Sequence, residues 1–484
     1  MPQPSTGRAG FVVLATNAAW RAEVVPSPPP ETPETAKARR AKRLTRHPRM
    51  RLAGEGPAPR GPPLPIHRRP APPRRHRVRT LLPPHPATVP MSIEQVERYG
   101  AHNYHPLPVV VAHAEGAWVT DVGGRRYLDM LSAYSALNQG HRHPRILAAA
   151  REQLDRVTLT SRAFHNDQLG PFLERLSRVS GFSRALPMNS GAEAVETALK
   201  AVRKWGYVTK GIPTDKAEII VATDNFHGRT ISIVSFSTEA AYRDGFGPFT
   251  PGFVVVPYGD AAAVEAAIGP NTCAVFLEPI QGEAGVIVPP DGYLRAVRDA
   301  CTRTNTLLVM DEIQTGLGRT GTMWASDHEN VRPDAITIGK ALGGGVYPVS
   351  AFCADDAVME VFSPGTHGST FGGNPMAAAV ASAALDVLVD EQLAARAKRV
   401  GESFRAALRG LGSARVKEVR GRGLLIGVEL HADAGRARPY CERLMDLGVL
   451  CKDTHEQVIR FAPPLVIAEG DIDWALEHIR TVLA

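Results

Sequence analysis

The sequence of 484 residues has few cysteines and no long apolar run, and both absences exclude classes of protein. Its five cysteines are scattered, and none has the CxxC spacing of a zinc site, so we expect no metal. Their scatter also argues against a disulfide framework and favours a reducing compartment, the cytoplasm. No apolar run approaches the ~20 residues that a membrane-spanning helix needs. The 44% hydrophobic and 22% charged residues are typical of a globular protein.

The positive charge of the chain is concentrated in its first 90 residues. This stretch has 17 Lys and Arg against 4 Asp and Glu, a net charge of +13, and holds 20 of the 40 prolines. The remainder has 39 basic and 45 acidic residues, a net charge of −6, so the pI does not indicate nucleic-acid binding by the whole chain. We interpret residues 1–90 as a disordered or artefactual extension ahead of Met91. An arm that binds polyanions is the alternative.

The order of predicted strands and helices along the chain indicates two domains of different fold class. Strand, loop and helix recur at least four times between residues 185 and 345, which predicts an α/β fold with a large, mostly parallel sheet and covering helices. We place this large domain at residues 141–385. Helices then alternate with short strands, which indicates a smaller α+β domain at residues 386–484. Residues 91–140 form an N-terminal segment that joins the small domain.

Local patterns place further elements in these domains. The turn at Asp121–Arg126, with the sequence DVGGRR, predicts a β-hairpin. His141 and His143 stand before a helix, and no carboxylate or cysteine is spaced to share a metal with them, so we expect turn and capping roles. Among the C-terminal elements, helices are predicted at Glu391–Leu411 and Gly435–Leu447.

Two short apolar runs in the middle of the chain carry the strongest functional signal. Leu307–Met310 stops at Asp311, and Ala335–Ile338 stops just before Lys340. Such runs are typical of buried parallel strands, whose carboxyl ends face the ligand in open α/β sheets. An amine that forms a Schiff base and a carboxylate that holds a pyridinium nitrogen are what pyridoxal phosphate needs. Taken singly, a turn aspartate and a solvated loop lysine are the simpler interpretations.

Other motifs also stand at the ends of predicted strands. Ser190 and Glu193 fit a capping box before the helix at Ala194–Trp205. This helix start is either an ordinary one or a phosphate site, since a helix N-terminus offers free N–H groups. Phe226 and Arg229 follow another strand and suit ring stacking and carboxylate binding, or else simple loop packing and surface exposure.

Together these stretches resemble one enzyme family. The motifs LVMDEIQTGLGRTG, ITIGKALGGG, NSGAEAVETALK, NFHGRT, EPIQGEAGV and HGSTFGGNP are similar, in order and spacing, to those of the subgroup-III aminotransferases. These enzymes belong to the fold-type I pyridoxal-phosphate enzymes. The resemblance covers Met91–Ala484 and leaves residues 1–90 unexplained.

The resemblance implies a site for pyridoxal 5′-phosphate. Lys340 would bind the cofactor covalently and act as general acid and base. Asp311 would pair with the protonated ring nitrogen and keep the ring an electron sink. Thr370 would reach the phosphate in the partner subunit, so a homodimer with shared active sites is expected. The other expected cofactor-binding residues are Phe226, Gln314, Gly191, Ala192 and Ser369.

The stretches YGAHNYHPLPVVV, LSAYSALNQGHRHP and THEQVIRFAPPLVI narrow the resemblance to members that use ornithine and 2-oxoglutarate. This implies that Arg229 with Tyr104 binds ornithine's α-carboxylate, leaving the δ-amine at the cofactor, while Tyr134 shapes the pocket. Arg460 would bind the α-carboxylate of glutamate, and Glu283 would pair with Arg460 during the ornithine half-reaction. A plain structural ion pair is the simpler interpretation of these two residues. N-acetylornithine or another ω-amino acid is the alternative donor.

Overall fold

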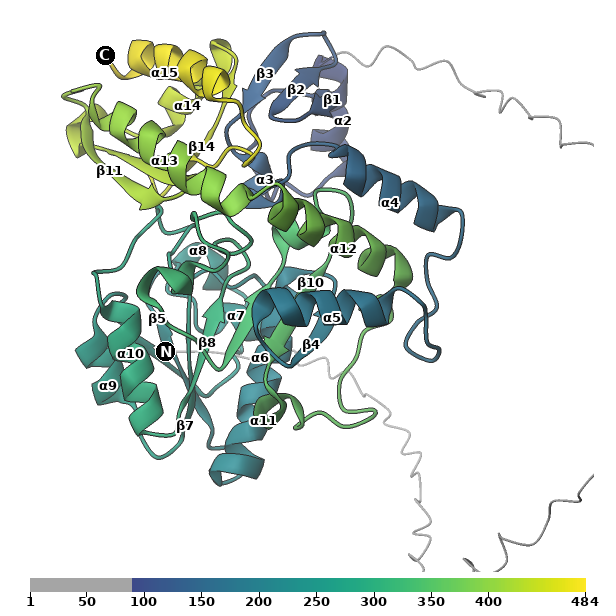
Figure 1. Cartoon of the computed structure of the whole chain (residues 1–484). Coiled ribbons are helices and arrows are strands. Elements are labelled where there is room, and N and C mark those ends of the chain that lie inside the picture. The colour runs from purple at the N-terminus through teal and green to yellow at the C-terminus, as the bar shows by residue number, and fades with distance from the viewer. Residues whose placement is uncertain (1–88) are drawn as a thin grey trace, which may run out of the picture. The chain divides into compact units, whose positions relative to one another are not determined.

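The structure is a computed structural model that describes residues 89–484 (Figure 1). The extension expected at residues 1–90 therefore lies outside the described residues, apart from its last two. Within residues 89–484, no helix is both long and apolar enough to cross a membrane.

A seven-stranded sheet forms the centre of the described fold (Figure 1). Its strands, in spatial order, are β4 (Arg184–Met188), β10 (Ser350–Ala354), β9 (Ala335–Ile338), β8 (Leu307–Asp311), β7 (Thr272–Leu277), β5 (Glu218–Ala222) and β6 (Phe253–Val256). All neighbours from β9 to β6 are parallel, which confirms the predicted mostly parallel sheet. β10 is antiparallel to both β9 and β4.

Both faces of this sheet are buried, because the side chains of each strand alternate between two cores. In β5, Ile219 and Val221 pack in the core that contains α6 (Gly191–Trp205). Ile220 and Ala222 belong to the core on the other face. That second core is closed by α5 (Leu169–Ser180), α10 (Tyr293–Arg303) and α12 (Pro375–Asp390). Burial on both sides explains why the strands are continuous apolar runs.

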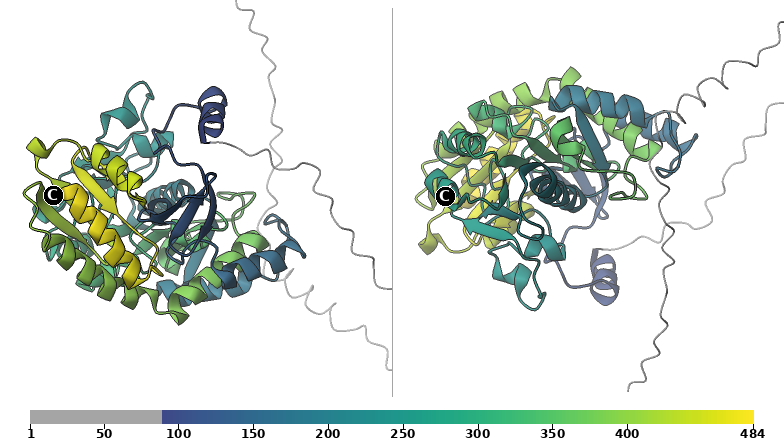
Figure 2. Two further views of the ribbon diagram at one scale, coloured as in Figure 1. Left: turned by 90° about the horizontal axis from the view of Figure 1, so that it is seen from above. Right: turned by 90° about the horizontal axis from the view of Figure 1, so that it is seen from below.

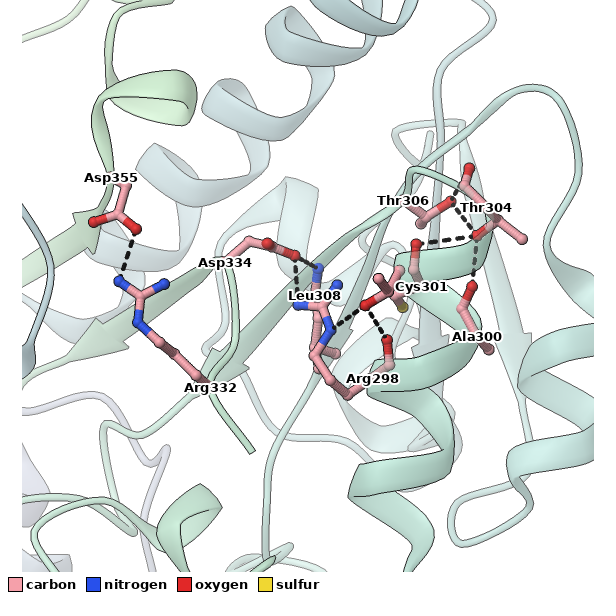
Figure 3. Close-up of polar contacts among 10 residues, drawn as sticks. Arg298, Ala300, Cys301, Thr304, Thr306, Leu308, Arg332, Asp334 and Asp355 are labelled. Atoms are coloured by element: carbon pink, nitrogen blue, oxygen red, sulfur yellow. Dashed lines mark hydrogen bonds and ion pairs between the residues drawn. The ribbon is translucent and has the colours of Figure 1, made fainter. Parts of the chain in front are cut away.

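A polar cluster aligns the starts of β8 and β9 (Figure 3). Asp334 accepts hydrogen bonds from the backbone nitrogen of Leu308 (2.7 Å) and from Arg298 of α10 (2.7 Å). These bonds tie the residue before β9 to β8 and to a covering helix. Because the two strands are parallel, fixing their starts also fixes their far ends, where Asp311 and Lys340 lie.

Two four-stranded sheets complete the described part of the chain. The first contains β1 (Val111–Glu115), β2 (Trp118–Asp121), β3 (Arg126–Asp129) and β13 (Val449–Leu450). The second contains β11 (Val416–Arg422), β12 (Leu425–Leu430), β15 (Val458–Phe461) and β14 (Lys452–Thr454), with α13 (Leu393–Arg409), α14 (Arg438–Asp446) and α15 (Glu469–Leu483) nearby. Trp118 lies 5.3 Å from Trp474 of α15, so the N-terminal strands lie beside the C-terminal helices (Figure 2).

Two predicted helices start later than expected. The helix predicted at Gly435–Leu447 begins only at Arg438, because Gly435 has a φ of +85° that no helix contains. The helix predicted at Glu391–Leu411 begins after Gln392, whose φ is +50°. Pattern alone did not reveal these left-handed residues.

The structure confirms one turn and corrects the histidine roles. The hairpin around Asp121–Arg126 forms, with β2 and β3 antiparallel. His143 precedes its helix without a side-chain cap bond and instead contacts Glu391 (3.0 Å). His141 contacts Asp129 (2.8 Å). In the described part, no group of three or more His, Cys, Asp or Glu side chains is placed to hold a metal.

Candidate active site

A cavity of about 140 Å³, here called the inner cavity, lies at the carboxyl ends of the parallel strands. Asp311 is the last residue of β8 and Lys340 follows β9 by two residues, so both reach the sheet edge where ligands bind. Six of the residues expected to hold the cofactor line this cavity: Lys340, Asp311, Gln314, Phe226, Gly191 and Ala192.

Asp311 is fixed by hydrogen bonds to both of its carboxylate oxygens. Its Oδ2 lies 2.7 Å from Nδ1 of His227, a fully buried ring that packs edge-on against Phe276 at 4.6 Å. Its Oδ1 accepts from the hydroxyl of Thr337 (3.0 Å) and from the backbone nitrogen of Ile313 (3.1 Å). The carboxylate is therefore oriented before any ligand arrives. No sequence motif indicates a role for His227 or Thr337, because each contact joins residues that are distant in sequence.

Two ionisable groups in the inner cavity are perturbed by burial. Burial lowers the pKa of Lys340, although the nearby Glu283 and Asp311 charges oppose this. Burial also raises the pKa of Glu278 well above its ordinary value, while the backbone nitrogen of Phe226 donates to its carboxylate (3.0 Å). Both shifts favour the neutral forms, so the lysine is more readily a free amine here than on a surface.

The start of α6 forms one wall of the inner cavity, and its capping box is confirmed. Ser190 Oγ accepts from the Glu193 backbone nitrogen (3.2 Å), and the Glu193 carboxylate accepts from the Ser190 backbone nitrogen (2.7 Å). A Cβ atom on Gly191 would lie 3.1 Å from Ile313, so a side chain at this position would crowd Ile313. The free N–H groups here suit an anion.

The two expected residues from the loop before α12, Ser369 and Thr370, lie outside the lining of the inner cavity. Ser369 accepts a hydrogen bond from the Asn189 side-chain amide (2.8 Å), which places it beside the start of α6. Thr370 is exposed and lines neither the inner cavity nor the larger pocket next to it. The structure therefore does not bring Thr370 to the site of its own subunit.

A larger pocket of about 660 Å³, here called the outer pocket, adjoins the inner cavity at Lys340 and Phe226. The expected substrate-binding residues Tyr104, Tyr134 and Arg229 line it. A guanidinium nitrogen of Arg229 donates to the Tyr104 hydroxyl at 3.5 Å. Three aromatic rings surround that guanidinium, those of Tyr104 (5.9 Å), Phe226 (5.4 Å) and Tyr242 (4.8 Å). Tyr242 was not among the expected site residues.

Glu283 and Arg460 form a buried ion pair between the two spaces. Arg460 donates to Glu283 (2.7 Å) and to the backbone oxygen of Gly282 (3.2 Å), and Gln314 donates to the same Glu283 oxygen (3.0 Å). Burial alone would raise the pKa of Glu283, but the Arg460 charge and these hydrogen bonds outweigh it and lower the pKa to about 2. A Cβ atom on Gly282 would lie 1.4 Å from the Gln314 side-chain oxygen, so a side chain at this position fits only if the end of Gln314 moves.

Three buried polar atoms at this ion pair lack protein partners. They are the side-chain oxygen of Gln314 and Nε and Nη2 of Arg460. Buried polar groups are nearly always hydrogen-bonded, so unpaired ones beside a cavity are suited to a ligand. A polar ligand with both donor and acceptor groups, one of them anionic, fits these three atoms.

The fully buried side chain of Arg319 connects the walls of the outer pocket. It donates to Ser132 Oγ (3.2 Å) and to the backbone oxygen of Pro463 (2.6 Å). Ser132 begins the turn that carries Tyr134, in which four successive residues have positive φ, and Pro463 follows the strand of Arg460. Burial lowers the pKa of Arg319 to about 9. Its position holds Tyr134 against Arg460, whose guanidinium lies 5.3 Å from the tyrosine ring.

Nearly all of the described chain is similar to known proteins. Residues 99–483 match the family described as Aminotransferase class-III. The chain is 61% identical over 391 residues to the ornithine aminotransferase of Brevibacillus brevis, covering 81% of this chain and 97% of that protein. A structure of the ornithine aminotransferase from Toxoplasma gondii, with partial occupancy of pyridoxal phosphate (PLP) at its active site, has a TM-score of 0.81 and 47% identity, covering 82% of this chain and 94% of that one. An acetylornithine aminotransferase from Elizabethkingia anophelis has a TM-score of 0.75 and 48% identity, covering 82% and 98%.

Proposed function

Because the chain belongs to the class-III aminotransferases, as the match over residues 99–483 shows, we propose that it transfers the δ-amino group of L-ornithine to 2-oxoglutarate. The products are L-glutamate 5-semialdehyde and L-glutamate. The observation that carries this proposal is that two arginines of the site are in different states, one behind Glu283 and one in the lining of the outer pocket. Arg460 is covered by Glu283, whereas Arg229 forms no ion pair in the described part of the chain. Such an enzyme reacts with the δ-amine of ornithine, which is distant from the carboxylate, and with the α-amine of glutamate, which is next to it. It therefore needs one arginine that is free and another that can be covered.

The inner cavity fits pyridoxal phosphate, which is the cofactor that we propose. When bound, this group supplies an electron sink for the substrate carbon that loses or gains a proton. Asp311, held by three hydrogen bonds, would bind the ring nitrogen, and Phe226 would pack on the ring. The backbone N–H groups of Gly191 and Ala192 would bind the phosphate at the start of α6. Gln314 lines the same cavity and would make a polar contact with the ring.

Lys340 would hold the cofactor covalently and carry the proton at its Nζ atom. Only a neutral amine can act as nucleophile or accept a proton, and burial favours that form by lowering the lysine pKa. Lys340 lines both the inner cavity and the outer pocket, so its amine can reach a substrate carbon that enters from the outer pocket.

The outer pocket would orient the two substrates differently. Arg229 with Tyr104 would bind the α-carboxylate of ornithine, which leaves the δ-amine free to reach the inner cavity. Tyr134 would bound the same space. Glu283 would cover Arg460 while ornithine is bound and move aside when glutamate presents its own α-carboxylate. The low pKa of Glu283, about 2, keeps it anionic and able to cover Arg460 at neutral pH.

We also place the enzyme in the cytoplasm as a homodimer whose subunits share active sites. The five cysteines are free and buried, which supports a reducing compartment. The exposed Thr370 is available to a partner subunit, where it would contact the phosphate beside Ser369. Mixing a Thr370→Ala chain with a Lys340→Ala chain tests the sharing. Dimers that contain one chain of each variant should have an activity that differs from the average of the two variant homodimers.

A panel of amino donors tests the substrate assignment. The wild-type enzyme, loaded with pyridoxal phosphate, should transfer nitrogen from L-ornithine to 2-oxoglutarate with a higher kcat/KM than from N-acetyl-L-ornithine or 4-aminobutyrate. The acetylornithine enzyme among its relatives makes N-acetyl-L-ornithine the decisive competitor. A preference for that donor would overturn the proposal, because the pocket would then select an uncharged acetamide at the α-position.

A further inference from the structure

The outer pocket contains one carboxylate whose charge is not compensated by the protein. Four carboxylates line this pocket, and three have cationic partners. Glu283 pairs with Arg460 (2.7 Å), Glu456 with Arg436 (3.0 Å), and Asp453 lies 3.9 Å from both Arg438 and Lys452. The fourth, Glu239, forms no ion pair with any residue that the structure describes.

Glu239 is nevertheless held in place at the pocket wall. Its Oε1 accepts from the backbone nitrogen of Ala241 (3.3 Å), and its own backbone nitrogen donates to Ser237 Oγ (3.2 Å). Through Oε1 it caps the short helix α8 (Ala240–Arg243). The carboxylate is exposed, and it keeps an oxygen, Oε2, for another donor.

An uncompensated cation lies on the same wall. Arg229 forms no ion pair within residues 89–484, and its guanidinium lies 4.8 Å from the ring of Tyr242. The backbone nitrogen of Tyr242 in turn donates to the backbone oxygen of Glu239 (3.1 Å). The residues that carry this cation and this anion are therefore linked through Tyr242, and both line the same pocket. This is the arrangement that an amino-acid head group, with its carboxylate and ammonium on one carbon, would satisfy.

We infer that Glu239 binds the α-ammonium group of the donor while Arg229 binds its α-carboxylate. The inference rests on the proposed function and identifies the substrate class more closely, as α,ω-diamino acids with a free α-amine. A carboxylate that accepts a hydrogen bond from an ammonium group rejects analogues that lack the charge, because its own desolvation is then unrewarded. Glu239 is thus a specificity-determining residue, and it leaves the chemistry at Lys340 unchanged.

The sharpest test compares ornithine with 5-aminopentanoate, which is ornithine without its α-ammonium group. In Glu239→Gln, kcat/KM for L-ornithine should fall about ten- to a hundredfold, the usual value of a hydrogen bond to a charged group. The kcat/KM for 5-aminopentanoate should stay within about threefold of wild type, since that donor never made the contact. Equal losses for both donors, or no loss for either, would overturn the inference.

Two control variants separate this contact from general effects. Glu456→Gln removes a negative charge from the same pocket, but one already paired with Arg436. It should leave the ratio of the two donors unchanged, and a drop equal to that of Glu239→Gln would attribute the effect to general charge instead. Asp260→Asn alters a comparable helix cap, on α9 (Ala261–Ala267), at a residue that does not line the pocket. It should change neither donor.

The glutamate half-reaction gives an internal check in the same protein. Glutamate enters with two carboxylates, so loss of the Glu239 charge should not lower its kcat/KM. A parallel fall for glutamate would show damage to the pocket and overturn the assignment. The two proposals fail separately. A wild type that prefers N-acetyl-L-ornithine contradicts the proposed function, whereas an ornithine-preferring wild type with an unchanged donor ratio in Glu239→Gln contradicts only this inference.

Discussion

The inner cavity and the outer pocket hold their functional side chains in different ways. Asp311 in the inner cavity is 4% exposed and accepts hydrogen bonds from three neighbours, among them His227 and Thr337. Tyr104 in the outer pocket is 61% exposed and reaches Arg229 only at 3.5 Å. The first arrangement is rigid before ligands bind, and the second can adjust to what enters.

The difference follows from where the residues come from. The inner cavity is built at the ends of neighbouring strands of one sheet, whose spacing is set by backbone hydrogen bonds. The outer pocket combines the N-terminal segment, the segment between β5 and β6, and β14 with the turn that follows it. Chemistry is therefore supported by the sheet, while substrate choice depends on segments that can vary without disturbing it.

The largest effect should come from Lys340→Ala in the inner cavity. Loss of the amine removes both the covalent attachment and the proton carrier, so kcat for ornithine should fall by about 10²–10⁴-fold or more. Borohydride reduction followed by peptide mapping checks the attachment. The wild type should carry the cofactor mass on the peptide that contains Lys340, and a labelled lysine elsewhere in the variant would contradict the assignment.

A smaller but still large effect is expected for His227→Leu. The leucine keeps a buried side chain of similar size but removes the 2.7 Å contact to Asp311. We expect kcat to fall about 10- to 100-fold, with little change in KM for ornithine, since the histidine acts through Asp311 and not on substrate. His143→Leu, which breaks a histidine–carboxylate contact outside both spaces, is the control. A rise in KM without a fall in kcat would contradict the description of the inner cavity as rigid.

The ion pair between the two spaces should give a pH-dependent effect on stability. The folded-state pKa of Glu283 is about 2, against an ordinary value of 4.5. A depressed pKa contributes stability that is fully present above pH 4.5 and is lost as pH falls toward 2, which amounts to about 3 kcal/mol.

Glu283→Gln removes this contribution, so it should be most destabilising near neutral pH. Urea unfolding of wild type and variant from pH 6 down to pH 3 measures the difference, which should shrink as the pH falls. Glu265→Gln, at an exposed ion pair, should differ from wild type by less than about 1 kcal/mol throughout. A constant difference for Glu283→Gln would mean that the pair contributes no proton linkage.

The smallest effect is expected for Tyr104→Phe at the exposed wall of the outer pocket. The variant loses one long hydrogen bond to Arg229, so KM for ornithine should rise about two- to tenfold while kcat stays unchanged. Tyr99→Phe changes an exposed tyrosine of the same segment that does not line the pocket, and it should have no effect. A loss in kcat would show that the outer pocket also positions the reacting groups.

Local sequence patterns were enough for strands that are buried along their whole length. The run predicted at Ala335–Ile338 has those limits in the structure, and the run predicted at Leu307–Met310 extends by one residue, to Asp311. The antiparallel direction of β10 could not be predicted, because it depends on pairing with β4 and β9.

The same limit applies to the candidate site. Residues recognised from motifs, such as Asp311 and Lys340, lie together as expected. Three residues that position parts of the site, His227, Thr337 and Arg319, were missed because each is hydrogen-bonded to a residue distant in sequence. Glu239 was missed for a different reason. Its carboxylate is distinguished by having no ion-pair partner among the described residues, and only the three-dimensional contacts reveal this.

Gly282 has a consequence for how this pocket can evolve. No side chain fits at this position while Gln314 keeps its place, because the two would overlap. Positions 282 and 314 are therefore coupled, because a side chain at 282 requires that the glutamine rotate away or be replaced. A lineage that acquires a new specificity through this wall would change the placement or the identity of residue 314 as well. Homologous chains that lack glycine at the equivalent position should differ at the position of Gln314, in the residue or in its side-chain orientation.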